Sequence, residues 1–284
     1  MKKILIPFDF SENAGNALRL AHFIAQRSGG EVVLVNVVEY APGISPGKEG
    51  ADAPGVEAEY LGHLFDTLEA HLNKTVSLLR SDQIPVSLKV EAGNVVKILL
   101  KLANELACDL IIMGAQGQDR SEEFFTESKN ERILRLARVP VLTVRNLKEP
   151  FGIKRIVFAT DLQLDQKVPL EKIRVFQSLF EAELYLLYIN TPNNFMASRE
   201  IFQQAQQLAA QAQLQDYHLH IESDYSEEMG IMHFAETLDA DMVSLATRQR
   251  RGLAYFFTGS LTEKIVTHAQ RPILAFGMKY GSPI

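Results

Sequence analysis

Two glycines in the middle of the chain, Gly114 and Gly117, follow an apolar run, and Ser128 begins a helical pattern shortly after them. A backbone built from glycine approaches phosphate oxygens closely, because no side chain is in the way. The first turn of a helix presents free N–H groups and the positive end of the helix dipole to an anion. The combination predicts a phosphate-binding loop between residues 114 and 128, and we favour this role over simple turn geometry.

An aspartate follows the first apolar run of each half of the chain, Asp9 in the first half and Asp161 in the second. Each has a structural explanation as a neighbour of a helix N-cap, which Ser11 would supply after Asp9. The recurrence of the acid in both halves is more than a cap requires. We therefore predict a ligand role for Asp9 and favour the structural role for Asp161.

Other residues with chemical potential give weaker signals. Arg248, Arg250 and Arg251 form a basic cluster, for which a solvated loop is favoured over an anion site. His218 and His220 would share one face of a strand, as a metal-binding pair does, but no third ligand is evident and an exposed polar face is the favoured interpretation. No Ser-His-Asp arrangement, nucleophile elbow or pair of catalytic carboxylates can be placed, so we predict no catalytic residue and no metal site.

Composition limits the class of protein. The chain has 284 residues, 46% of them apolar, with a net charge of -6 and no long basic block, which disfavours a nucleic-acid or anionic-membrane binder. Cys108 is the only cysteine, so neither an intrachain disulfide nor a cysteine-built zinc site is available. No stretch approaches the roughly 20 apolar residues of a membrane span. These features predict a cytoplasmic protein whose partners are small molecules and proteins.

Internal similarity divides the chain into two halves. The matching segments are residues 3–9 with 155–161, 31–35 with 183–187, 109–113 with 241–245, and 138–142 with 270–274. The first half is longer by one insertion, residues 41–58, whose Gly, Pro and Asp content predicts a loop. Polar residues around Pro150 separate the halves, so we predict two domains, 1–147 and 152–284.

Each half alternates short apolar runs with helical patterns. In the first half the predicted strands are 4–8, 32–38, 86–90, 110–113 and 141–144; the predicted helices are one capped by Ser11 and stopped by Gly29, then 57–79, 95–106 and 128–136. This alternation predicts an α/β fold of two Rossmann-like doubly wound domains, each a five-stranded mainly parallel sheet with helices on both faces. Ligands of such sheets bind at the carboxyl ends of the strands, where Asp9, Val37 and Gly114 fall.

The segment from Met113 to Ser128 resembles the phosphate loop of the universal stress protein family, Gly-x-x-Gly followed nine residues later by Gly-Ser or Gly-Thr. The opening Lys-Ile-Leu-Ile-Pro-x-Asp-x-Ser and the closing Val-Pro-Val-Leu-x-Val of the first half are similar to the same family. The resemblance covers nearly the whole of both halves. It implies a tandem two-domain member packed as a pseudo-dimer, in which the terminal strands 141–144 and 273–276 pair antiparallel.

The resemblance also implies a ligand, ATP or another adenine nucleotide, with or without Mg2+. By position it puts Asp9 on the ribose or adenine side, the main chain of Val37 on the adenine edge, and Gly114, Gly117 and Ser128 on the phosphates. A second site would use Asp161, Arg250, Gly259 and Ser260.

The sequence departs from the family pattern in both halves. Glu127 stands where the family has glycine, and three more acidic residues lie in the same loop, which argues against tight binding of a triphosphate. In the second half Ala246 and Gln249 replace both leading glycines, which restricts the backbone room that phosphate contact requires. Nucleotide binding is therefore expected mainly in the first half.

The function expected from these residues is that of a regulatory stress protein, which binds an adenine nucleotide and thereby alters its contact with an unidentified protein partner. The alternatives are an interaction scaffold with degenerate nucleotide sites and a slow ATP hydrolase, the latter disfavoured because no base or magnesium ligand is apparent. Neither nucleic acid nor membrane is an expected partner. The pseudo-dimer forms within one chain, with homodimerisation left open.

Overall fold

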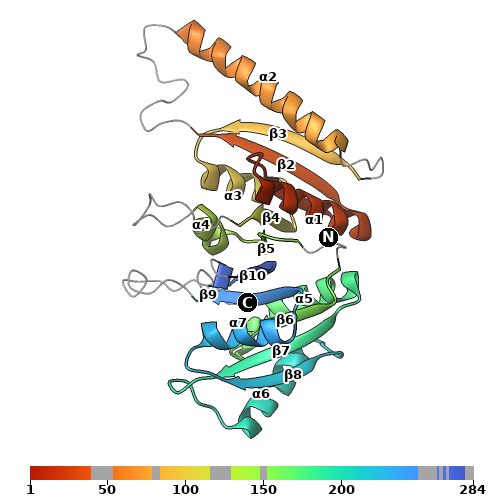
Figure 1. The fold of residues 1–284 in the computed structure, drawn as a ribbon, viewed down its shortest axis with the longest axis vertical. Helices are drawn as coiled ribbons and strands as arrows, with labels where there is room; N and C mark the ends of the chain where they lie inside the picture. The colour runs from red at the N-terminus through yellow and green to blue at the C-terminus, as the bar shows by residue number, and fades with distance from the viewer. Residues whose placement is uncertain are drawn as a thin grey trace. The chain divides into compact units, whose positions relative to one another are not determined.

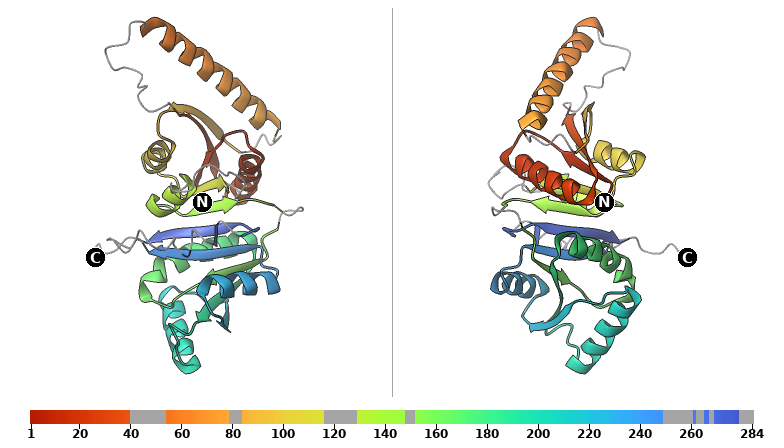
Figure 2. Two further views of the ribbon diagram at one scale, coloured as in Figure 1. Left: turned by 60° about the vertical axis from the view of Figure 1, so that its left-hand side comes forward. Right: turned by 90° about the vertical axis from the view of Figure 1, so that its right-hand side faces the viewer.

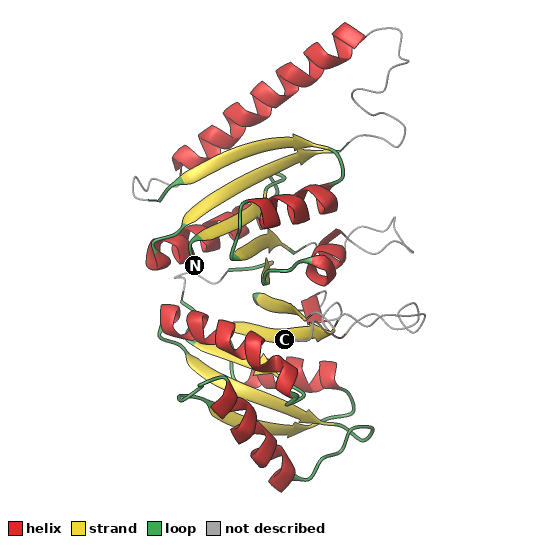
Figure 3. Cartoon of the chain, turned by 180° about the vertical axis from the view of Figure 1, so that it is seen from behind, coloured by secondary structure: helices red, strands yellow, loops and turns green. Residues whose placement is uncertain are grey.

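The computed structural model describes residues 1–39, 54–78, 84–115, 129–147, 152–248, 261, 265–266 and 269–278. The chain divides into two compact units, Met1–Met113 and Gly114–Ile284, which are described separately. Strands and helices alternate along both units, as Figures 1 and 3 show. The α/β class expected from the alternating pattern is confirmed.

The first unit is built on a parallel sheet with the strand order β3-β2-β1-β4. Its elements are β1 (Lys3–Pro7), α1 (Glu12–Ser28), β2 (Glu31–Val38), α2 (Pro54–Leu78), β3 (Val86–Ala92), α3 (Val95–Glu105) and β4 (Leu110–Gly114). Helices α1 and α3 lie on opposite faces of the sheet (Figure 2). Because β1 and β2 are covered on both faces, their central residues are buried and apolar without alternation.

Local chemistry sets the ends of α1. The side chain of Ser11 accepts a hydrogen bond from the N–H of Ala14 at 3.2 Å, which satisfies one of the free donors of the first turn. At the other end Gly29 adopts the left-handed conformation with φ of 64°, and its N–H donates to the carbonyl of Ala25. The cap and the stop expected at these two residues are both confirmed.

The second unit contains a six-stranded sheet with the order β5-β10-β9-β6-β7-β8. Its strands are β5 (Val141–Val144), β6 (Arg155–Ala159), β7 (Glu183–Asn190), β8 (His218–Ser223), β9 (Met242–Arg248) and β10 (Ile273–Met278). Its helices are α4 (Lys129–Leu136), the 3-10 turn η1 (Leu164–Gln166), α5 (Lys167–Phe180), α6 (Ser198–Gln211) and α7 (Glu227–Thr237). Five of the strands, from β10 to β8, are parallel.

The terminal strands β5 and β10 pair antiparallel, as the family resemblance implied. Their register joins Thr143 to Ile273, Leu142 to Leu274 and Val141 to Ala275. The side chain of Thr143 adds a hydrogen bond to the carbonyl of Ile273 at 3.4 Å. Each of these strands therefore gains a partner along one edge.

The strand bounds expected in the first half agree with the structure to within two residues. The loop predicted for residues 41–58 was partly wrong. Residues 54–58, expected in a loop, belong to α2, which begins at Pro54 instead of residue 57. Proline is favoured at the first position of a helix, because its missing N–H is not needed there and its φ is already helical. Residues 41–53 of the expected loop lie outside the described residues. No helix in the described ranges is long and apolar enough to cross a membrane.

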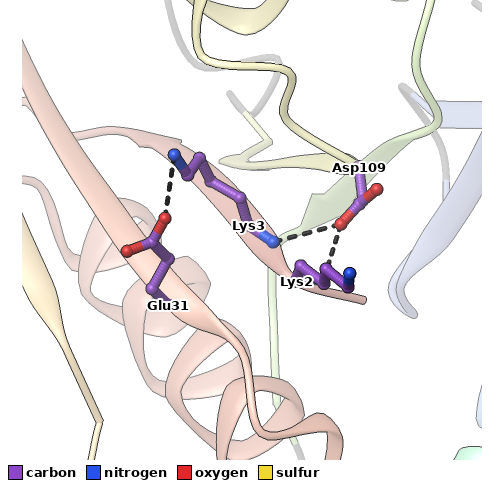
Figure 4. A network of polar contacts seen from close by, with 4 residues as sticks. All are labelled: Lys2, Lys3, Glu31 and Asp109. Atoms are coloured by element: carbon purple, nitrogen blue, oxygen red, sulfur yellow. Dashed lines mark hydrogen bonds and ion pairs between the residues drawn. The ribbon is translucent and has the colours of Figure 1, made fainter.

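An aspartate holds the amino ends of the central strands together in both units. Oδ2 of Asp109, just before β4, accepts hydrogen bonds from the main-chain N–H groups of Lys2 and Lys3 at 2.5 and 3.1 Å (Figure 4). Nζ of Lys3 also pairs with Glu31 at 2.8 Å. In the second unit Oδ2 of Asp241 accepts from the N–H groups of Lys154 and Arg155 at 2.8 and 2.9 Å. The internal repeat thus preserves a carboxylate bridge at the sheet end opposite the expected ligand site.

Removal of this bridge is expected to destabilise the protein. Asp109→Ala and Asp241→Ala should each lower the free energy of unfolding by about 1 to 2 kcal/mol, because two charge-assisted hydrogen bonds are lost at a solvent-exposed position. Urea denaturation measures the change, with Asp66→Ala on the exposed side of α2 as the control. Losses no larger than that of the control would show that the bridge adds nothing to stability.

Candidate functional site

The carboxyl end of β1 leads into a tight turn at Asp9. Oδ1 of Asp9 accepts a hydrogen bond from the N–H of Ser11 at 3.0 Å, and Phe10 between them has a left-handed φ of 64°. In the second unit Oδ1 of Asp161 accepts from the N–H of Gln163 at 3.2 Å, again across a left-handed residue. A left-handed conformation is unfavourable for a residue with a side chain, so the aspartate stabilises it in both units. The structural role weighed for both aspartates is therefore present.

The main-chain groups of Val37 point to the β1 side, beyond the last paired residue of that strand. The carbonyl of Val35 accepts from the N–H of Phe8 at 2.8 Å on the β1 side, and the carbonyl of Val38 accepts from the N–H of Gly93 at 2.9 Å on the β3 side. Successive residues of a parallel strand direct their main-chain groups to alternate neighbours. Val37 therefore points to the β1 side, where the register of β1 has already ended at Pro7.

Asn36 closes the end of β1 onto β2. Its side-chain Nδ2 donates to the carbonyl of Phe8 at 2.7 Å, and the residue is buried. Sequence reasoning missed this residue, although a single amide within an otherwise apolar strand run was an available signal. The bond fixes the backbone between β1 and Asp9, and with it the position of the Asp9 carboxylate relative to Val37.

An aromatic contact at the same strand end was also missed. The Phe10 side chain is 41% exposed, and its ring lies edge-on to the ring of Phe8 at 5.3 Å and to His71 of α2 at 6.1 Å. No sequence pattern indicates this arrangement, because it depends on the left-handed backbone at Phe10 and on the packing of α2. The contact places α2 next to the residues expected to hold a ligand.

In the second unit, side chains that follow β6 form hydrogen bonds with one another at the corresponding strand end. The hydroxyl of Thr160 donates to the side-chain oxygen of Gln166 and accepts from the N–H of Leu162 at 2.9 Å. Leu162, which corresponds to Phe10, is only 2% exposed. The space after β6 is therefore occupied by an internal hydrogen-bonded network.

Hydrogen bonds also hold the connection that follows β7. The side chain of Asn190 donates to the carbonyl of Met196 and accepts from its N–H, both at 2.9 Å. The hydroxyl of the buried Tyr188 donates to the carbonyl of Asn194 at 3.3 Å. These three bonds hold residues 190–196 against the end of the strand.

Three carboxylates act on the hydroxyl of Tyr188 at this end of the second sheet. Burial raises the pKa of the Tyr188 hydroxyl, and the nearby carboxylates of Glu227, Asp161 and Glu200 raise it further. An anionic ligand would be repelled by the same three carboxylates. The electrostatics therefore oppose phosphate binding at the ends of β6 and β7.

The structure places only part of the expected phosphate loop. Gly114 is the last residue of β4 and the first of the second unit, where its carbonyl accepts from Nδ2 of Asn130 in α4 at 3.0 Å. The remaining expected site residues lie outside the described residues: Gly117, Glu127, Ser128, Arg250, Gly259 and Ser260.

The two histidines of β8 share a face, as expected, and lie against aromatic rings. Tyr185 is 5.0 Å from His218 and 5.7 Å from His220, and Phe234 is 4.9 Å from His220. The described ranges contain no group of three or more His, Cys, Asp or Glu side chains placed to hold a metal ion.

Comparisons with known proteins agree over the whole chain. The model of the universal stress protein family matches residues 1–145 and again 152–276. Universal stress protein E of Escherichia coli strain K12 is 24% identical over 314 aligned residues, which cover 100% of this chain and 96% of that protein. A shorter universal stress protein of Methanocaldococcus jannaschii is 28% identical over 155 residues, 51% of this chain and 94% of its own length.

Solved structures share the fold. A universal stress protein from Archaeoglobus fulgidus superposes with a TM-score of 0.76 at 18% identity, covering 98% of this chain and 97% of that one. A structure from Pseudomonas aeruginosa gives a TM-score of 0.69 at the same identity, with 98% and 93% covered.

Proposed function

The chain belongs to the universal stress protein family, and on that basis we propose that it binds an adenine nucleotide in its first half and regulates a protein partner in the cytoplasm. The first half would supply the Asp9 carboxylate for the ribose or adenine and the main chain of Val37 for the adenine edge. Gly114, Gly117 and Ser128 would contact the phosphates. The domain bounds 1–147 and 152–284 are part of the proposal.

The single observation that carries the proposal is the geometry at the end of β1. The main-chain groups of Val37 point to the β1 side beyond the last register pair, Pro7 with Val35, and Asn36 holds the neighbouring backbone in place. Asp9 is exposed, and within the part of the chain that the structure describes its hydrogen bond to Ser11 uses Oδ1, which leaves Oδ2 for a ligand hydroxyl in this proposal. A donor and an acceptor of the main chain beside a carboxylate match the polar groups of a nucleoside.

Replacement of the carboxylate in the first half is expected to weaken nucleotide binding. Asp9→Ala should raise the dissociation constant for ATP, AMP or cAMP about tenfold, the cost of one charge-assisted hydrogen bond of about 1.4 kcal/mol. The panel includes cAMP, which one solved universal stress protein holds. Isothermal titration calorimetry measures the affinity.

The matched control is Asp161→Ala, which removes the equivalent turn of the second unit. It should leave affinity and stoichiometry unchanged, because the strand ends there are filled by Thr160 and Gln166. An equal loss of affinity in both variants, or no loss in Asp9→Ala, would contradict the assignment of the site to the first half.

Glu127 is expected to select against the triphosphate. A carboxylate about 4 Å from a phosphate oxygen costs up to roughly 4 kcal/mol at an effective dielectric constant near 20. Glu127→Gly should therefore strengthen ATP binding about tenfold or more, with a smaller gain for AMP. Calorimetry on the variant decides this: an equal gain for both nucleotides would show that Glu127 does not sense the outer phosphates.

An interaction scaffold without nucleotide is the second candidate, favoured by the filled and acidic strand ends of the second unit. Mass spectrometry of ligand released from gently purified protein separates the two candidates. Phosphate release abolished by Asp9→Ala would be required to support slow ATP hydrolysis instead.

A further inference from the structure

Three large apolar side chains are exposed where β7 and β8 end. Phe195 is 78% exposed, Tyr225 86% and Met229 56%. Phe195 lies in the connection from β7 to α6, and the other two flank the N-cap of α7. Because β7 and β8 are parallel neighbours, both connections leave the sheet at the same edge (Figure 1). We call these three residues the apolar triplet.

Hydrogen bonds join the two connections that carry the triplet. The carbonyl of Asn190 accepts from the N–H of Asp224 at 3.2 Å, and its side chain holds the main chain of Met196, the neighbour of Phe195. Such connections lose little conformational freedom when a partner binds, which lowers the entropic cost of association. The triplet is therefore exposed on a preorganised surface.

The fold does not require an apolar residue at Tyr225 or Met229. Helices α3 and α7 start with equivalent caps: the side chain of Asn94 accepts from the N–H of Lys97, and that of Ser226 accepts from the N–H of Met229. The first unit thus has lysine at the position of Met229. The residue before the cap is glycine in the first unit and Tyr225 in the second. Two of the three exposed apolar groups are specific to the second unit.

The charges near the triplet are mostly negative. The carboxylates on the same connections and first helical turns are Glu200, Asp224, Glu227 and Glu228. Arg199 is the only lysine or arginine between residues 190 and 230. An apolar centre with an acidic rim is complementary to an apolar segment flanked by cations.

We propose that the surface formed by Phe195, Tyr225 and Met229 docks a segment of a partner protein in which apolar side chains are flanked by lysine or arginine. Aromatic residues and methionine are enriched at the centres of interfaces, where they contribute most of the binding energy. The proposal rests on the partner-binding part of the proposed function and not on its nucleotide-binding part.

A random peptide library displayed on phage, selected against the full chain, tests the proposal. The enriched peptides are expected to combine aromatic or aliphatic residues with lysine or arginine. The dissociation constant of a selected peptide should rise at least tenfold in the double variant Phe195→Ser/Tyr225→Ser and should also rise with salt concentration. Leu136→Ser, an exposed apolar residue at the end of α4, is the control and should bind normally.

Met229→Lys provides an independent variant, because it introduces the residue type that the first unit has at the equivalent position, Lys97. It should weaken the same peptides by charge repulsion, and circular dichroism verifies that each variant is folded. Enrichment of neutral or acidic peptides, or unchanged affinity in the double variant, would overturn the proposal. A wild-type dimer that these substitutions dissociate would also overturn it, in favour of a second copy as the occupant.

Measurement with and without ATP separates this inference from the proposed function. Peptide binding that is equal in both conditions supports the docking surface and contradicts only its regulation by nucleotide. ATP binding without any selected peptide contradicts the docking surface and leaves the nucleotide site standing.

Discussion

Replacement of Tyr188 by alanine is expected to lower the free energy of unfolding by about 3 to 5 kcal/mol, the cost of truncating a buried aromatic ring in a core that cannot fully collapse around the cavity. Tyr188 is 1% exposed and is the bulkiest fully buried side chain among the residues that the structure describes. Urea denaturation followed by circular dichroism measures the change. The effect is large because β7 is an interior strand, flanked by β6 and β8, and the ring is almost fully buried.

Tyr188→Phe is the matched control, because it retains the ring and removes only the hydroxyl that donates to Asn194. Its expected loss is about 1 kcal/mol, that of one hydrogen bond. The same variant should weaken peptide binding at the apolar triplet, since the loop carrying Phe195 loses one of its three anchoring bonds. A loss of stability in Tyr188→Ala no larger than that in Tyr188→Phe would contradict the packing role of the ring.

The thiol of Cys108 is expected to react with dithionitrobenzoate at least a hundredfold more slowly in the native protein than in the unfolded chain. Burial raises its pKa to about 11 from the reference value of 9.0; the Lys3 ammonium opposes this shift, and the carboxylates of Asp109 and Glu31 add to it. The reactive species is the thiolate. At pH 8, a pKa of about 11 instead of 9.0 reduces the fraction of thiolate about a hundredfold. Burial of the side chain also limits the access of the reagent to the sulfur.

The measurement is simple because Cys108 is the only cysteine of the chain. Absorbance after mixing gives the native rate, and the same reaction in concentrated urea gives the control rate. Stability should also fall as the pH rises from about 9 to about 11, since the unfolded thiol ionises first, and the fall should be smaller in Cys108→Ala. Equal rates in the native and unfolded states would contradict the buried, protonated thiol.

The fold could be predicted from the sequence because each helix and strand contains residues that mark its type and its ends. Ser11 and Gly29 define the ends of α1 through capping and the left-handed conformation, both of which depend on residue type. The duplicated pattern predicted the second set of strands and helices, and the family resemblance implied the antiparallel pairing of the last strand. Pro54 is the exception: proline is typical of loops, but here it begins α2, because the first helical position needs no N–H.

The candidate site was only partly predictable. The position of Asp9 at a strand end followed from the apolar run before it, but its turn with Ser11 depends on the left-handed conformation of Phe10, which no propensity indicates. The filled strand ends of the second unit depend on side-chain rotamers of Gln166 and Asn190. Such contacts are set by packing between elements, so a pattern along the chain does not contain them.

The antiparallel pairing of β5 with β10 also has a consequence for biosynthesis. About 130 residues separate Thr143 from its partner Ile273, and β10 leaves the ribosome after every other described strand. Until then the edge of β5 that β10 later covers has no partner within the nascent chain. Unpaired strand edges recruit other strands, so an incomplete chain is expected to associate with neighbouring chains on a polysome unless a chaperone protects it.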